Sequence, residues 1–118
     1  AAEVVAALGG RAITVADADR ARYHAAACIA SNHLVALLGQ VERVAPPGVP
    51  LEAYLDLVWA TVANVAELGP AAALTGPAAR GDWATIERHR DALAALDPTE
   101  LAAYEALVAL ASRLVADA

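Results

Sequence analysis

The sequence predicts an all-α domain: four principal helices in a bundle-like arrangement, preceded by a short N-terminal helix and an extended appendage. The chain has 118 residues, about the size of one ordinary domain. Alanine, which has the highest helix propensity of all residues, occurs 34 times. Apolar residues recur at spacings of three and four over long stretches, as they do on the buried face of a helix.

The first 15 residues precede the four helices. "AEVVAALGG" indicates a short helix that ends at Gly9 and Gly10. "RAITV" indicates a short extended segment, because Ile13 and Val15 alternate with polar or small residues. The sequence begins in the middle of a pattern and without methionine, which suggests a fragment of a longer protein. Residues 16–118 then form the helical domain itself.

Caps and breaks delimit the four helices. We expect the first over 17–45, capped by Asp17 and ended by "PPGVP", and the second over 51–68, ended by Gly69-Pro70. The third is expected over 83–96 with Asp82 as its N-cap. The fourth follows "DPTE", a capping-box pattern with Asp97 as the cap and Glu100 as the acid of the box.

Composition and charge exclude several classes of protein. The net charge is −6 and arginine supplies all eight strong bases, so the chain lacks the basic surface of a nucleic-acid-binding protein. Residues 23–41 carry no formal charge and approach the length of a membrane span. They also contain polar groups that lipid would leave unsatisfied, so we read them as a buried helix of a soluble, cytoplasmic protein without a membrane segment. The single cysteine, Cys28, cannot form an internal disulfide.

The first helix carries a row of polar residues. At about 100° per residue, His24 and Ser31 lie within about 20° of each other, and Cys28 lies about 40° away. His24 and Cys28 are too few ligands for zinc, so we expect no metal site. From residue types alone, two interpretations stay open: His24 and Ser31 satisfy each other within a packed core, or they belong to a functional site.

The segment "ALTGPAARGD", residues 73–82, interrupts the helical pattern. Thr75, Gly76 and a following proline allow a close turn, and Gly81 allows an unusual backbone angle before Asp82. Arg80 can hold a carboxylate or phosphate through two parallel hydrogen bonds, or it can pair with a nearby acid. "ERHRD" at 87–91 is typical of a solvated helix face.

Two strings together carry a resemblance to a known family: "YHAAACIASNHLVAL" and "ALTGPAARGDWATIERHRDAL". They resemble the C-terminal helical domain, of unknown function, of bacterial Rossmann-domain proteins. More distantly, the domain is similar to the C-terminal domains of the 6-phosphogluconate dehydrogenase superfamily. Residues 1–15 would then be the tail of, or the link to, a nucleotide-binding domain absent from this chain.

The resemblance implies a site and roles for its residues. It implies that His24, Ser31 and Asn32, with Thr75, Gly76, Arg80 and Asp82, line a cleft against the nucleotide-binding domain. His24 would be the general acid, Asn32 would orient the substrate, and Arg80 would hold a substrate anion or organise the loop. Several members of the superfamily have a catalytic lysine four residues before such an asparagine; Cys28 stands there, and this chain has no lysine.

The expected function is that of a substrate-binding and dimerisation domain of an NAD(P)-dependent oxidoreductase. The resemblance implies a small-molecule substrate and a homodimer, with NAD or NADP bound mainly by the chain's own N-terminal Rossmann domain. The isolated chain has no Gly-x-Gly-x-x-Gly fingerprint, so it should neither bind the dinucleotide nor catalyse alone. The alternatives are a non-enzymatic helical interaction module and a nucleotide-sensing protein that has lost catalysis.

Overall fold

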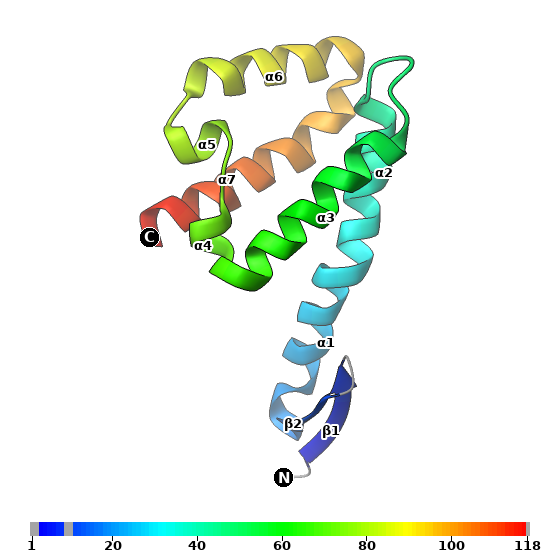
Figure 1. Cartoon of the computed structure of the whole chain (residues 1–118), viewed down its shortest axis with the longest axis vertical. Coiled ribbons are helices and arrows are strands. Elements are labelled where there is room, and N and C mark those ends of the chain that lie inside the picture. Colours follow the sequence, from blue (N-terminus) through cyan, green and yellow to red (C-terminus); the bar gives the residue numbers. More distant parts are fainter. Residues whose placement is uncertain (1–2, 9–10, 118) are drawn as a thin grey trace. The chain divides into compact units, whose positions relative to one another are not determined.

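A computed structural model describes residues 3–8 and 11–117 of the chain. The chain divides into two compact units, Ala1–Gly39 and Gln40–Ala118, called unit 1 and unit 2 below. Four principal helical segments dominate the structure, as the sequence predicts: residues 20–44, then α3, α6 and α7 (Figure 1). The all-α class with four principal helices is therefore confirmed.

Unit 1 begins with a pair of strands. β1 (Glu3–Leu8) pairs antiparallel with β2 (Arg11–Ala16), in a register that runs from Glu3 opposite Ala16 to Leu8 opposite Arg11. The extended segment "RAITV" is confirmed as β2, but the short N-terminal helix predicted before Gly9 is wrong. β-branched residues in both segments favour strands, and each segment pairs with the other. Gly9 and Gly10 lie outside the described residues.

The long helical segment of unit 1 has an interruption. A 3-10 turn, η1 (Asp17–Asp19), leads into α1 (Arg20–Cys28), a π-helical segment, η2 (Ile29–His33), and the start of α2 (Leu34–Val44). The prediction that Asp17 caps this helix is wrong: its carboxylate instead pairs with Arg20, at 2.6 Å, within the first turn. The predicted burial is also wrong, since most side chains over 24–36 are exposed.

Unit 2 contains the end of α2 and the remaining helices. These are α3 (Leu51–Leu68), α4 (Pro70–Ala73), α5 (Pro77–Arg80), α6 (Trp83–Leu96), a 3-10 turn η3 (Pro98–Glu100) and α7 (Leu101–Asp117). Helix α7 is central in this unit, because it contacts α4, α5, α6 and η3, whereas α3 packs mainly on α4. Gly69, with φ of 79°, ends α3 as predicted.

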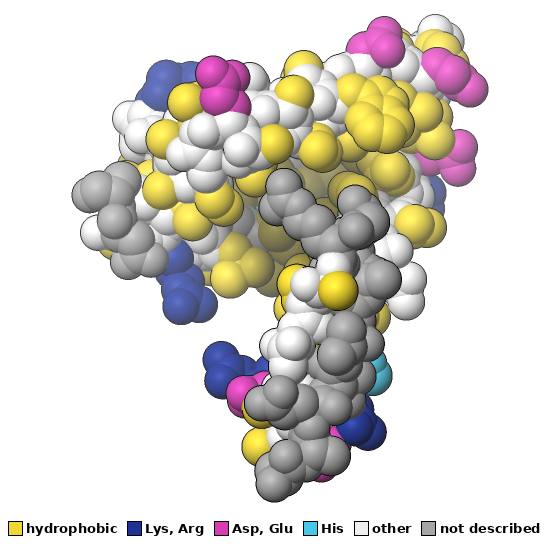
Figure 2. Space-filling view, turned by 60° about the horizontal axis from the view of Figure 1, so that its bottom comes forward, with side chains coloured by type: hydrophobic (Ala, Val, Ile, Leu, Met, Phe, Trp, Pro, Cys, Tyr) yellow, Lys and Arg dark blue, Asp and Glu magenta, His cyan; other side chains and the backbone are white. Residues whose placement is uncertain are grey.

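The core of unit 2 is small. Among the described residues, Ile86 and Leu93 of α6 are the buried apolar side chains, and Glu100 is the buried charged one. Hydrophobic side chains cover much of the visible face of this unit in Figure 2. In the C-terminal half of α3, the apolar residues Val62, Val65 and Leu68 recur at helical spacing and are exposed by 38–55%.

The capping motif at residues 97–100 forms only in part. The carboxylate of Asp97 accepts hydrogen bonds from the backbone N–H and the hydroxyl of Thr99, at 3.0 and 2.8 Å, so Asp97 is the predicted cap. Glu100 does not close the box: its carboxylate binds Arg43 at the end of α2. A tertiary ion pair has replaced the predicted local contact.

Over the part of the chain that the structure describes, no helix is long and apolar enough to cross a membrane.

Candidate functional site

The polar residues of unit 1 lie open to solvent. His24 is on α1, and Ser31 and Asn32 are on the π-helical segment; all three are exposed. Within the described residues, none of their side chains makes a hydrogen bond, and the ring of His24 lies beside that of Tyr23, with centroids 5.6 Å apart. The interpretation in which His24 and Ser31 satisfy each other in a packed core is therefore not supported.

The π-helical segment alters the geometry of this row. A π turn holds more residues than the 3.6 of an α-helix, so it changes the direction in which later residues point relative to earlier ones. The angles that placed His24 and Ser31 on one line assume an uninterrupted α-helix, which ends here at Cys28. Wide turns of this kind are rare and are found frequently at functional sites. The π-helical segment contains Ser31 and Asn32, the "SN" of the first string that carries the family resemblance.

Cys28 ends α1 as a free, half-buried cysteine. Across residues 3–8 and 11–117 no three His, Cys, Asp or Glu side chains are grouped so that they could hold a metal ion.

The loop residues of unit 2 form two glycine-dependent turns. Gly76 has φ of 94° and ψ of −174° and precedes α5, whose first residue is Pro77. Gly81 ends α5 in the left-handed conformation, with φ of 66°. Residues with a Cβ rarely adopt either conformation, and the first is available almost only to glycine. The close turns predicted for this segment are confirmed.

Asp82 and Arg80 have different roles in this loop. Asp82 caps α6 as predicted: its carboxylate accepts from the backbone N–H of Thr85 at 3.1 Å and from the Thr85 hydroxyl at 2.7 Å. These bonds, the hydroxyl's first, lower the pKa of Asp82 below its ordinary value. Arg80 approaches Asp82 only to 3.7 Å and its side chain is 61% exposed, so its guanidinium retains donors for an anion.

The seven predicted residues therefore fall into two groups. His24, Ser31 and Asn32 belong to unit 1, whereas Thr75, Gly76, Arg80 and Asp82 belong to one loop of unit 2. Each group is formed by residues near in sequence. That the two groups line one cleft stays a prediction.

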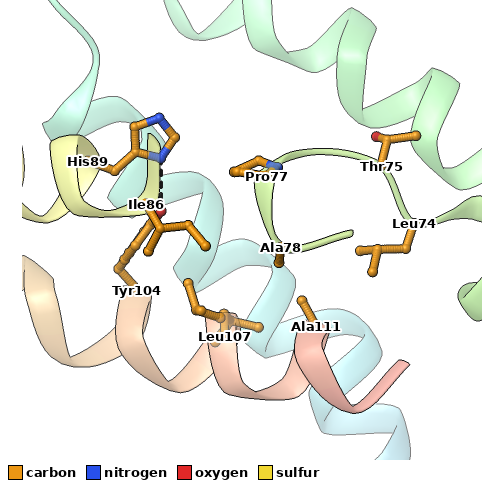
Figure 3. Close-up of a pocket in the computed structure, with 10 residues that line it drawn as sticks. Leu74, Thr75, Pro77, Ala78, Ile86, His89, Tyr104, Leu107 and Ala111 are labelled. Atoms are coloured by element: carbon orange, nitrogen blue, oxygen red, sulfur yellow. Dashed lines mark hydrogen bonds between the residues drawn. The ribbon is translucent and has the colours of Figure 1, made fainter. Parts of the chain in front are cut away.

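Sequence reasoning missed a pocket that lies entirely within unit 2. Its volume is about 280 Å³, and its walls come from the loop after α4, from α5, α6 and α7 (Figure 3). Thr75 is the predicted site residue that lines it. The other polar groups are His89 of α6, which lies in the segment predicted to be a solvated face, and Tyr104 of α7.

His89 and Tyr104 form a hydrogen-bonded pair at this pocket. The Nδ1 atom of His89 lies 2.8 Å from the hydroxyl oxygen of Tyr104, and the rings meet edge to face, with centroids 5.8 Å apart. Burial raises the pKa of Tyr104 above its ordinary value, so this hydroxyl stays neutral at physiological pH. The 15-residue separation of the pair gives no local sequence signal; the turn between α6 and α7 brings the two residues together.

The segment "ERHRD" is more than a solvated face. The guanidinium of Arg90 holds Glu105 of α7 through two hydrogen bonds, of 2.5 and 3.0 Å, and Glu87 of its own helix at 3.1 Å. These contacts fix α6 against α7 beside the His89–Tyr104 pair, and they raise the pKa of Arg90.

A family described as a domain of unknown function (DUF2520) matches residues 1–111 of the chain. No curated protein and no solved structure matches this chain.

Proposed function

From the premise that this chain belongs to the DUF2520 family of domains of unknown function, we propose that it is the substrate-binding and dimerisation part of an NAD(P)-dependent oxidoreductase. In this proposal NAD or NADP binds mainly to a Rossmann domain of the same protein, outside this chain. The chain alone binds no dinucleotide and catalyses no reaction.

The observation that carries the proposal is the π-helical segment Ile29–His33. It displays Ser31 and Asn32 without a structural partner among the described residues, about two turns beyond His24. π turns are rare and occur frequently at functional sites, so this turn supports a functional role for the segment. Exposed polar residues at such a turn are what a site against a further domain requires.

Each residue of the site has a role in the proposal. His24 donates the proton that accompanies hydride transfer, since imidazole is the side chain best suited to exchange protons near neutral pH. Asn32 and Ser31 orient the substrate by hydrogen bonds. Arg80 holds an anionic group of the substrate, and Thr75 and Gly76 shape the loop, with Asp82 anchoring it to α6.

Cys28 limits the mechanism. Several of the dehydrogenases that the chain distantly resembles have a catalytic lysine four residues before an asparagine; if Asn32 matches that asparagine, the position is that of Cys28, and this chain has no lysine. A protein that binds NAD(P) as a sensor, without turnover, is therefore the alternative within the same assembly.

The homodimer is part of the proposal, and exposed apolar side chains support it. Leu57, Trp59 and Leu68 of α3 are exposed by 64, 72 and 55%. Aromatic and large aliphatic residues of this kind are enriched in protein interfaces. The same observation favours the other alternative, a non-enzymatic interaction module, if no dinucleotide-binding domain accompanies the chain.

The test begins with the intact mass and N-terminal sequence of the natural gene product. A product longer by a domain with a dinucleotide fingerprint supports the proposal. That product is then screened for oxidation of NADH and NADPH with small carbonyl and imine compounds. A natural product that starts near Ala1 contradicts the proposal and leaves the interaction module.

With an active substrate, His24→Gln should lower kcat by about 100-fold or more, because general acid catalysis contributes factors of this size. The matched control is His33→Gln, an exposed histidine of the same helical segment with no assigned role. Equal losses in the two variants would contradict the role of His24. Binding of NADPH without turnover of any compound would identify the sensor instead.

A further inference from the structure

The pocket beside the His89–Tyr104 pair has the size of a small-molecule site. Its volume of about 280 Å³ is close to the lower end of the range usual for ligand pockets. Figure 3 shows Ile86, Leu107 and Ala111 directed towards its interior, with His89 and Thr75 at opposite sides. We propose that this pocket binds a small, uncharged, largely apolar molecule with one hydroxyl group, held by the His89–Tyr104 pair.

The walls determine the polarity of the ligand. Apart from Thr75, His89 and Tyr104, the residues that line the pocket are Leu, Ile, Val, Ala and Pro. Neither an arginine nor a carboxylate is among them, so a charged group would gain no ionic partner from these walls. An aromatic ring or a short branched chain would bury apolar surface against Ile86 and Leu107.

The His89–Tyr104 pair supplies one polar contact. If Tyr104 donates to Nδ1 of His89, its oxygen can still accept a hydrogen bond; if the imidazole donates, the tyrosine O–H is free to donate. A ligand hydroxyl satisfies both cases, because it both donates and accepts. Tyr104 is neutral at physiological pH and burial raises its pKa further, so its hydroxyl group keeps its proton for such a contact.

This site does not depend on the proposed oxidoreductase function. It shares Thr75 with the proposed substrate loop, but His24, Asn32 and Arg80 do not line it. The 118-residue chain is therefore sufficient to test it.

The methyl signals of the isoleucines report directly on binding in this pocket. The chain has three isoleucines, Ile13, Ile29 and Ile86, and of these Ile86 alone lines the pocket. In an NMR titration of Ile-methyl-labelled chain with 4-fluorophenol, the Ile86 signal should shift and the other two should stay in place. A dissociation constant on the order of 1 mM is expected for so small a probe. The charged probe 4-fluorobenzoate, with the same ring, should not shift Ile86.

Two variants locate the binding. Ala111→Leu fills the pocket and should abolish the shift of Ile86, whereas Ala109→Leu, the same change at an exposed position of α7, should leave it unchanged.

A third variant tests the polar contact. Tyr104→Phe keeps the ring and removes the hydroxyl, so the affinity for 4-fluorophenol should fall by about five-fold, the usual value of one net hydrogen bond. Circular dichroism of each variant should show the helical content of the wild-type chain, as a check that it is folded.

Three titration results would overturn the proposal. These are no shift of Ile86 at a 4-fluorophenol concentration 10-fold above the expected dissociation constant, equal shifts with both probes, or an undiminished shift in Ala111→Leu. An Ile86 signal that changes on dilution of the protein, and not with the phenol, would also overturn it. That outcome would mean that a second copy of the chain occupies the pocket.

Discussion

Glu100 shows how one residue can change its role between sequence and structure. Its side chain is 7% exposed, and its carboxylate accepts hydrogen bonds from Nε and Nη2 of Arg43 at 2.5 and 3.3 Å. Gln40 donates to the backbone carbonyl of the same residue at 3.1 Å. The pattern "DPTE" predicted a local cap, but the charge of a buried carboxylate needs a stronger partner than one backbone N–H. Glu100 thereby joins α2 to the start of α7.

We predict that Glu100→Gln lowers the Tm of the chain by about 5 °C at pH 7, because the neutral amide loses the charge-assisted bonds with Arg43. The bonds from Arg43, the largest cause, keep the folded pKa of Glu100 below its ordinary value of 4.5. Its stabilising effect is therefore present above about pH 4.5 and is lost as the pH falls through the lower, folded pKa. Melting curves from pH 7 to pH 3 should show a flatter acid limb for the variant.

The control for this prediction is Glu105→Gln, which removes an exposed carboxylate that also binds an arginine, Arg90. Exposed pairs contribute little, so its melting temperature should change by less than that of Glu100→Gln. Equal changes in the two variants would show that the burial of Glu100 does not matter.

At the scale of elements, helix α5 is defined by its two glycines. It has four residues, and Gly76 and Gly81 flank it with φ of 94° and 66°. At both positions nothing lies within 4 Å of where a Cβ would be, so space does not require glycine there. Glycine is required there because of the backbone conformation, in which φ is positive at both positions.

Alanine substitutions at Gly76 and Gly81 should lower the free energy of unfolding by different amounts, because the two backbone conformations differ. Gly81→Ala should cost about 1 kcal/mol, the usual cost of the left-handed region. Gly76→Ala should cost about 2–3 kcal/mol, because its φ and ψ belong to a region almost restricted to glycine. Urea unfolding of both variants measures the difference. The reverse order, or no loss in either, would contradict the turn geometry.

At the scale of the whole molecule, the main feature is how little apolar surface the chain buries. Among its described residues, only Ile86 and Leu93 are buried hydrophobic residues, whereas Trp59, Val35 and Leu57 are exposed by 64–72%. Exposed apolar side chains in such number are typical of surfaces that another protein or domain covers. The apolar spacing of α3 correctly predicted a helix but not what would cover its C-terminal half.

This feature predicts self-association through α3. If the dimer uses α3, Trp59→Glu should weaken it by about 10-fold or more, since tryptophans at interface centres contribute strongly. The chain's other tryptophan, Trp83, is exposed at the start of α6 and provides the matched control Trp83→Glu. Sedimentation equilibrium over a range of concentrations measures both. A monomeric wild-type chain, or equal effects of the two substitutions, would exclude α3 as the interface.

The sequence by itself determined the features that depend on neighbours along the chain. The helices from Leu51, Trp83 and Leu101, the cap at Asp82 and the turns at Gly76 and Gly81 follow from spacing, capping groups and backbone freedom, which act within a few residues. The strand Glu3–Leu8 was mistaken for a helix because its alanines and leucine also suit a helix, and the ladder bonds that decide between the two come from a second segment.

Only the tertiary structure decided the features that join distant residues. The pairs Arg43–Glu100 and His89–Tyr104 span 57 and 15 positions, and no local pattern specifies them. The pocket beside His89 likewise exists only where four segments meet. The π-helical turn at Ile29–His33 was also unpredicted, because it differs from an α-helix in hydrogen-bonding register and not in residue preference. Local residue preferences determine where helices and turns form, whereas packing between these elements determines which distant side chains come into contact.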